Sequence, residues 1–232
     1  MAAEAHSTAT LRLSVGDLKV VHPITVPSGP VAAHEVVPAL QGLVNAVVAA
    51  AEAGKAISCR KGCGACCRQL VPVSRTEGER LLGVIEAMAP ERRKELGARF
   101  AAAASAIKGA GLDQRRGRAD RELSTGYFAL GIACPFLEEE SCSIHPERPL
   151  VCREYLVTSP AELCGGPAQE GVTPVPVPKV SMAARGLQDE REEWFPLAML
   201  MEWSRTRPKG GSRKTGPEWI QRFLAKMSTK RT

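Results

Sequence analysis

Four cysteines crowded into nine residues, Cys59-Arg-Lys-Gly-Cys63-Gly-Ala-Cys66-Cys67, constrain this chain more than any other feature. Gly62 and Gly64 lie between them, and glycine lets a loop wrap closely around an ion because it tolerates positive φ. The segment is therefore predicted to be a loop that binds a metal. Four more cysteines follow about 70 residues later. The predicted ligands are all eight thiols: Cys59, Cys63, Cys66, Cys67, Cys134, Cys142, Cys152 and Cys164.

Cysteines at such spacings serve disulfides, zinc sites or iron–sulfur clusters. The first 20 residues lack a basic and then apolar leader, so we expect a cytoplasmic protein, whose thiols stay reduced. Zinc takes four sulfur or nitrogen ligands per site, so eight cysteines with His145 would supply two sites. Iron–sulfur clusters also take cysteine thiolates. Spacing alone leaves the two metals open. We predict an iron–sulfur cluster, of the [4Fe-4S] type, with Zn²⁺ as the alternative.

The spacing Cys59-x3-Cys63-x2-Cys66 is also that of radical S-adenosylmethionine enzymes. Two features count against this class. Ala65 stands where that family usually has an aromatic residue, and the chain shows none of the repeated βα units that a barrel needs.

Basic residues surround the first cysteine group: residues 53–76 contain five Lys or Arg and no acid. A positive environment favours the thiolate, which is the form that binds metals. In the second group, Arg148 and Arg153 are expected either to face the cluster sulfurs or an anion, or to pair with Glu147 and Glu154. His145 is expected to have a local role beside the ligands.

Hydrophobic periodicity predicts a mainly α fold with a small β component, its helices arranged around two cysteine-rich metal-binding loops. A hairpin is expected over 11–28, turning at Gly16-Asp17, and an extended segment over 173–178. Residues 119–131 are ambiguous. The predicted helices are 32–53, 75–88 behind the capping box Ser74–Glu77, 90–107, 181–205 and 217–228.

These elements divide the chain into four parts. We expect an N-terminal hairpin and helix, a cysteine-cluster domain, an extended segment with a helix packed on it, and a basic tail: 1–54, 55–167, 168–207 and 208–232. The two cysteine groups are predicted to meet in space and share a metal centre. Metal binding would then be largely folding free energy.

Charge is concentrated at the C-terminal end. Residues 204–232 hold nine Lys or Arg and one Glu, a net of +8, so the other 203 residues carry −2 of the total of +6. The helix at 217–228 places Trp219 and Phe223 on one face. Either it docks on an acidic protein partner, moving about Gly210-Gly211, or it packs permanently on the body.

Two other classes of partner are disfavoured. Aromatic residues make only 4% of the chain, too few for a base-stacking platform, so binding of nucleic acid is not expected. The longest apolar stretch, residues 36–51, is interrupted by Pro38, Gln41, Gly42 and Asn45, so no membrane span is predicted.

The cysteine pattern resembles the YkgJ-type cysteine-cluster family, described as a zinc- or iron-chelating domain. The resemblance covers about residues 55–166 and implies metal ligands, not an activity. Flagellin lysine N-methylases carry a distantly similar pattern, which implies a methylase-like enzyme as one alternative. The residues that carry the resemblance are Cys59, Cys63, Cys66-Cys67-Arg68, Cys134-Pro-Phe-Leu137, Cys142-Ser-Ile-His145, Arg148-Pro149, Cys152-Arg153 and Cys164.

The predicted function is therefore that of a metal-binding cysteine-cluster protein, iron–sulfur in type, serving electron transfer or a redox-dependent modification. A zinc-stabilised binding module is the alternative from another class. No Ser-His-Asp set, P-loop or His-Glu-x-x-His motif indicates a catalytic site, so the sequence leaves open whether the protein is an enzyme.

Overall fold

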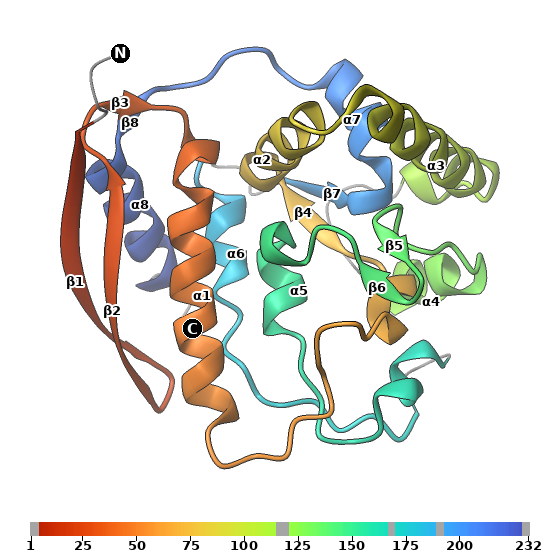
Figure 1. Cartoon of the computed structure of the whole chain (residues 1–232), viewed down its shortest axis with the longest axis horizontal. Coiled ribbons are helices and arrows are strands. Elements are labelled where there is room, and N and C mark those ends of the chain that lie inside the picture. Colours follow the sequence, from red (N-terminus) through yellow and green to blue (C-terminus); the bar gives the residue numbers. More distant parts are fainter. Residues whose placement is uncertain (1–4, 115–120, 167–169, 189–192, 229–232) are drawn as a thin grey trace.

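The computed structural model describes residues 5–114, 121–166, 170–188 and 193–228 (Figure 1). Its fold is mainly α with a small β component, as predicted. The α-helices are α1 Val37–Glu52, α2 Arg75–Glu86, α3 Pro90–Gly109, α4 Arg121–Ala129, α5 Leu150–Glu154, α6 Ser181–Arg185, α7 Leu200–Thr206 and α8 Gly216–Ser228. Shorter 3-10 turns that matter below are η1 Ala33–Val36, η2 Ala65–Arg68, η4 His145–Glu147 and η5 Ala161–Gly165.

In the described part of the chain, the strands form four separate antiparallel pairs rather than one sheet. The first pair is the predicted hairpin, which turns at Gly16 with φ of 58° and starts earlier than expected. The others join distant segments or close a tight turn. The pairs are β1 His6–Val15 with β2 Leu18–Pro27, β3 Pro30–Val31 with β8 Lys214–Thr215, β4 Pro72–Ser74 with β7 Trp194–Pro196, and β5 Leu137–Glu138 with β6 Ser141–Cys142.

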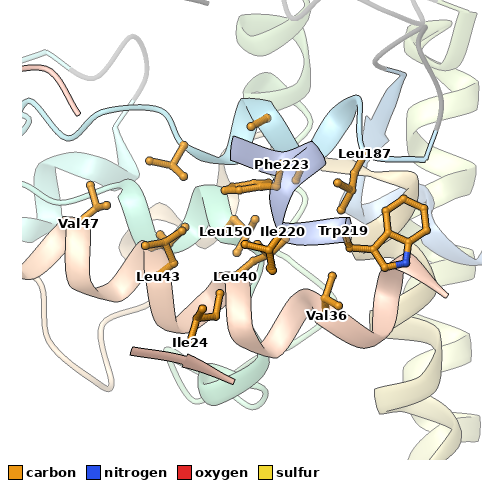
Figure 2. Packing of buried hydrophobic residues seen from close by; sticks show 14 of the residues in the cluster. Ile24, Val36, Leu40, Leu43, Val47, Leu150, Leu187, Trp219, Ile220 and Phe223 are labelled. Carbon is orange, nitrogen blue, oxygen red and sulfur yellow. The ribbon is translucent and has the colours of Figure 1, made fainter. Parts of the chain in front are cut away.

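The main hydrophobic core lies between the hairpin, α1, α5, α6 and α8. Strand β2 runs beside α1 (Figure 1), and its alternation turns Ile24 and Val26 inward. Figure 2 shows Leu40 of α1, Leu150 of α5 and Ile220 of α8 meeting in this core. The core therefore draws on residues from the first fifty, the middle and the last twenty of the chain.

Helix α8 belongs to this core. Trp219 and Phe223 have no exposed surface, and Trp219 Nε1 donates a hydrogen bond of 3.0 Å to the carbonyl of Val31. Of the two expectations for the basic tail, permanent packing is the one that the structure has. The picture of a helix that moves freely about Gly210-Gly211 is wrong, because its apolar face is already covered.

A second core lies between α2, α3, α7 and the β4–β7 pair. Phe195 stacks on Trp203 with ring centroids 4.4 Å apart, and Phe100 meets Phe136 edge to face at 5.4 Å. Phe136 follows Cys134 by two residues, so this core anchors the start of the second cysteine group.

The predicted helix over 181–205 is wrong. Helix α6 ends at Arg185, followed by Gly186, and Trp194 lies in a strand rather than a helix. Strand β7 pairs with β4, where Val73 faces Phe195, and this long-range pairing overrides the local helical pattern. Helix α7 starts only at Leu200. Residues 189–192 of the predicted helix lie outside the described residues.

The other predicted helices and the predicted extended segment are present in the structure. The helices expected at 32–53, 75–88, 90–107 and 217–228 are present with ends shifted by a few residues. Around 173–178 the chain is extended, and Val157 and Pro174 form an isolated bridge. Most of the ambiguous stretch, residues 119–131, is helix α4.

One described helical stretch, Ala33–Glu52, is long and apolar enough to cross a membrane by length and composition alone. Its apolar residues already have a partner in this fold. Leu40, Leu43, Val44 and Val47 have no exposed surface, because they form one wall of the main core.

Glu79 of α2 is predicted to make the stability of the fold depend on acid pH. Its carboxylate accepts hydrogen bonds from Arg75 Nε at 3.1 Å and Gln188 Nε2 at 2.6 Å, with His34 Nδ1 at 3.6 Å. Burial raises the pKa of Glu79, but these hydrogen bonds outweigh it and lower the pKa from 4.5 to about 2. The stabilisation is therefore present above about pH 4.5 and lost as the pH falls towards 2.

The Glu79→Gln variant tests this. We expect it to lower the free energy of unfolding by about 2 kcal/mol at pH 7 and by progressively less as the pH falls from 4.5 to 2. Urea unfolding at several pH values measures the difference. Glu86→Gln, at an exposed position of the same helix, is the control. A difference that stays constant with pH would contradict the role assigned to the ionised carboxylate.

Candidate metal centre

The eight cysteines come from six short segments. Cys59 and Cys63 lie in the loop after α1, Cys66 and Cys67 in η2, Cys134 before β5, Cys142 in β6, Cys152 in α5 and Cys164 in η5. All eight are free thiols, and none is exposed: Cys164 is buried and the other seven are half-buried. Thiols that are free and partly sheltered from solvent are suited to bind a metal.

Backbone hydrogen bonds bring the two cysteine groups together. The amide of Cys134 donates to the carbonyl of Cys67 at 2.7 Å, and the amide of Ser58 donates to the carbonyl of Val157 at 3.0 Å. Gln69 Nε2 donates to the carbonyl of Cys164 at 3.0 Å. The groups therefore meet, as the sequence predicted, although about 70 residues separate them.

The two cysteine groups lie side by side, but their thiols are not arranged to coordinate a metal. Within the described ranges, no three side chains of His, Cys, Asp or Glu stand close enough together to hold one ion. The donor chemistry fits zinc or iron, because the converging groups are thiols. Binding would require the thiols to draw closer than they stand here, so a metal shared between the two groups stays a prediction.

Electrostatic effects between the thiols show which of them are neighbours. A hydrogen bond to Cys67 raises the pKa of Cys66 far above its ordinary value. The charge of Cys66 in turn reaches thiols of both groups, adding to the burial that raises their pKa. These effects divide the thiols into two sets. The inner neighbourhood consists of Cys66, Cys134, Cys142 and Cys152. The outer neighbourhood consists of Cys59, Cys63 and Cys164, which lie on another side of Cys66.

Burial dominates the inner neighbourhood. It raises the pKa of Cys134 to about 12 and the pKa of Cys152 well above its ordinary value of 9.0. Such thiols are neutral at pH 7 unless a cation offsets the cost of burying their charge. A bound metal is such a cation, so metal binding here is expected to release protons.

The charge of Arg148 acts on thiols of both cysteine groups. Burial raises the pKa of Cys59, Cys142 and Cys152, and the hydrogen bond with Cys67 raises the pKa of Cys66. The positive charge of Arg148 lowers the pKa of all four thiols, but by less than these effects raise it. The Nε atom of Arg148 is buried and has no hydrogen-bond partner. A buried guanidinium N–H without an acceptor suits a site in which a thiolate, free or bound to a metal, accepts its hydrogen bond.

Arg153 plays a different part, so the two arginines are not equivalent. Its Nη1 donates to Asn45 Oδ1 at 3.0 Å, its Nε donates to the carbonyl of Arg148 at 3.0 Å, and its Nη2 donates to the carbonyl of Pro146. The alternative pairing of both arginines with Glu147 and Glu154 is wrong. Glu147 pairs with Arg80 at 2.9 Å, and Glu154 accepts hydrogen bonds from Ser181.

The tight turn between β5 and β6 covers η2. Its central residues, Glu139 and Glu140, have φ of 46° and 56°, the left-handed pair that a two-residue hairpin turn requires. Arg68 clamps the turn with two parallel hydrogen bonds to the Glu140 carboxylate, of 2.9 and 2.6 Å. Sequence reasoning missed this pair, because the two residues are 72 positions apart and nothing local links them.

Residues 58–166 match the family model CxxCxxCC, described as a putative zinc- or iron-chelating domain. This segment belongs to that family. The match includes all eight cysteines, and it confirms the resemblance noted in the sequence. No curated protein and no solved structure matches the chain. The hairpin, α1 and α8 lie outside the CxxCxxCC domain, and they form the core against which its helix α5 packs.

The basic residues near the first cysteines of the CxxCxxCC domain are mostly occupied elsewhere. Lys55 donates to the carbonyl of Ala51, Arg68 pairs with Glu140, and Arg75 pairs with Glu79. Arg60 and Lys61 are exposed. The expectation that five local cations sustain the thiolates is therefore corrected: of these five, Arg68 interacts with Cys67, whereas the charge of Arg148, in the second group, acts on four thiols.

His145 lies beside these cations in η4. Burial lowers its pKa below 6.5, and the charges of Arg148, Arg153 and Lys61 add to that effect. The site is thus electropositive apart from its thiols. Such a field favours an anionic centre, and the local role expected for His145 stays a prediction.

Gly64 is predicted to be indispensable for the CxxCxxCC domain. A Cβ at this position would lie 2.5 Å from Leu137 Cδ1 and 2.6 Å from the carbonyl oxygen of Glu140. The Gly64→Ala variant therefore has to push the β5–β6 turn away from η2. Overpacking of this kind costs about 1–3 kcal/mol, and it would separate Cys142 from Cys66. We expect lower thermal stability and a larger fractional loss of bound metal.

Gly165 supplies the matched control on the facing turn η5. A Cβ there would meet only the carbonyl oxygen of Ala65, at an ordinary contact distance of 3.8 Å. We expect Gly165→Ala to retain metal and stability. Equal metal content and melting temperature in the two variants would show that the Gly64 contact does not matter.

Proposed function

We propose that the CxxCxxCC domain binds an iron–sulfur cluster through its converging thiols and that the protein uses this centre in electron transfer or in a redox-dependent modification. The observation that supports the proposal is that free thiols from six short segments lie near Cys66. Thiolates suit zinc and iron–sulfur clusters, whereas calcium and magnesium prefer oxygen ligands.

The inner neighbourhood is the set of residues that would hold the cluster. Cys66, Cys134, Cys142 and Cys152 give the four thiolates that a [4Fe-4S] cluster takes from a protein. Once bound, the cluster supplies one-electron chemistry. The protein's own residues shelter it: Phe136 and Leu150, which flank these cysteines, have almost no exposed surface.

Iron is favoured over zinc by the charge around the site. The thiols face Arg148, with its buried unpartnered Nε, and His145 lies in a field of three cations. Positive charge and N–H donors are what an iron–sulfur cluster with its sulfides needs, and they tune its reduction potential. A structural zinc site would instead need only four tightly placed ligands.

The test is anaerobic purification followed by measurement of iron, acid-labile sulfide and zinc per chain. We expect a brown protein with iron and sulfide in equal amounts. Replacement of an inner pair, Cys142→Ser with Cys152→Ser, should remove the colour. Cys59→Ser, in the outer neighbourhood, should retain more of it. A colourless protein with stoichiometric zinc would overturn the iron assignment, and a protein without either metal would overturn the proposal.

The zinc-stabilised binding module remains the second candidate, because the family description names both metals. It differs from the first in one measurable respect. Zinc has no redox chemistry, so a zinc protein would keep the same absorption spectrum on addition of dithionite or ferricyanide. An iron–sulfur protein would bleach and recover.

A further inference from the structure

We propose that Arg148 is a positioning residue of the metal centre, whose Nε–H donates a hydrogen bond to a thiolate sulfur when the site is loaded. The inference rests on the proposed function, since it needs an anionic centre at these cysteines. It goes further by separating one arginine from its neighbours and by assigning it a defined contact.

The backbone of Arg148 is fixed in place. It ends η4 with φ of −55° and ψ of 146°, and Pro149 follows it directly, which restricts this residue to extended conformations. Its carbonyl accepts hydrogen bonds from Arg153 Nε at 3.0 Å and from Gln41 Nε2 at 3.4 Å. Both donors are residues of the buried interior. The point from which the side chain departs is therefore rigid.

The guanidinium of Arg148 lies close enough to the thiols for its charge to act on cysteines of both groups. Its Nε is buried without an acceptor, and a buried N–H of a charged group costs more than a neutral one when it has no partner. The nearby carboxylates do not supply the acceptor. Glu147 is paired with Arg80, and Glu154 and Glu77 accept from Ser181, Ser74 and Leu150.

With the carboxylates engaged, the thiol sulfurs are the remaining candidates for the acceptor. The four thiols on which the charge of Arg148 acts come from both cysteine groups, and Cys66 and Cys142 are among them. If the thiols draw together on a metal and become thiolates, they supply the missing charged acceptor. Partners that orient and tune metal ligands in this way typically contribute 10–100-fold to metal affinity.

Three variants separate the contact from charge and from folding. Arg148→Met removes both charge and donor, Arg148→Lys keeps the charge but lacks Nε, and Arg60→Met removes an exposed charge beside Cys59 as the control. Metal retention is measured by competition with a chelator. We expect Arg148→Met to lower the affinity about 10–100-fold, Arg148→Lys to recover only part, and Arg60→Met to match wild type.

Two further readouts exclude a merely structural role. If the bound metal is iron, loss of a positive donor should lower the reduction potential, and a residue that only supports folding would leave it unchanged. In the metal-free protein, alkylation of the thiols by iodoacetamide at pH 7 should slow in Arg148→Met and not in Arg60→Met. Circular dichroism checks that each variant is folded.

The outcomes distinguish this proposal from the proposed function. A wild type that holds metal, with Arg148→Met unchanged in affinity, would overturn the role of Arg148 and leave the metal centre standing. A wild type that holds no metal, with alkylation slowed in Arg148→Met, would overturn the metal centre and leave the contact between Arg148 and a thiolate. Unchanged alkylation together with no metal would overturn both.

Discussion

Replacement of Trp219 by alanine is expected to lower the free energy of unfolding by about 3–5 kcal/mol, the usual cost of emptying a fully buried aromatic site. Trp219 has no exposed surface and fills the main core beside Leu187 and Val36 (Figure 2). The variant also leaves the carbonyl of Val31 without its indole donor. Chemical denaturation followed by circular dichroism measures the loss.

A matched control lies two residues along the same helix. Gln221 is exposed, so Gln221→Ala is expected to change the stability by less than about 0.5 kcal/mol. Deletion of residues 208–232 removes Trp219, Ile220 and Phe223 together and is expected to leave no cooperatively folded protein. If the truncated chain keeps its metal and unfolds cooperatively, α8 is detachable and its place in the core is not needed.

The Glu77→Ala variant is expected to lower the free energy of unfolding by about 3–4 kcal/mol, nearly as much as Trp219→Ala, because it leaves two buried backbone donors unpaired. Glu77 is 4% exposed. One carboxylate oxygen accepts from the amide of Leu150 at 2.9 Å, and the other accepts from the amide and hydroxyl of Ser74 at 3.2 and 2.8 Å. The same side chain thus caps α2 and fixes the start of α5.

The position of Cys152 adds a second expected result. Cys152 lies in the first turn of α5, which the Leu150 contact holds against α2, so Glu77→Ala should weaken metal retention as well as stability. Glu86→Ala, on the exposed side of the same helix, is the control. Normal metal content in a destabilised Glu77→Ala protein would show that the start of α5 does not position Cys152.

Elements that depend on neighbouring residues could be predicted from the sequence. The hairpin turns at Gly16 because glycine accepts the positive φ, and Ser74 with Glu77 forms the predicted capping box at the start of α2. Pro90 opens α3 as expected. The helix over 181–205 failed because Phe195 pairs with Val73, and no local pattern reports a partner more than a hundred residues away.

The candidate site also combines features that local sequence predicts with features that depend on long-range contacts. Spacing and the resemblance predicted that the two cysteine groups meet, which the hydrogen bond between Cys134 and Cys67 confirms, whereas the role of the eight thiols as ligands stays a prediction. The roles of Arg148, Gly64 and Glu140 did not follow from either, because each depends on a contact that joins remote segments. Arg148 and Arg153 look alike in sequence, yet one lacks an acceptor for its Nε while the other is fully engaged with Asn45 and two carbonyls.

The pairing of β3 with β8, and of Trp219 with Val31, joins residues as far as 188 positions apart. On the ribosome, the main core cannot close until α8 has emerged, since nothing earlier in the chain fills its place. Leu150 of the CxxCxxCC domain packs in that same core, so helix α5, which carries Cys152, reaches its final packing only once α8 is in place. The order of synthesis therefore leaves the position of Cys152 among the last features of the cysteine cluster to be fixed.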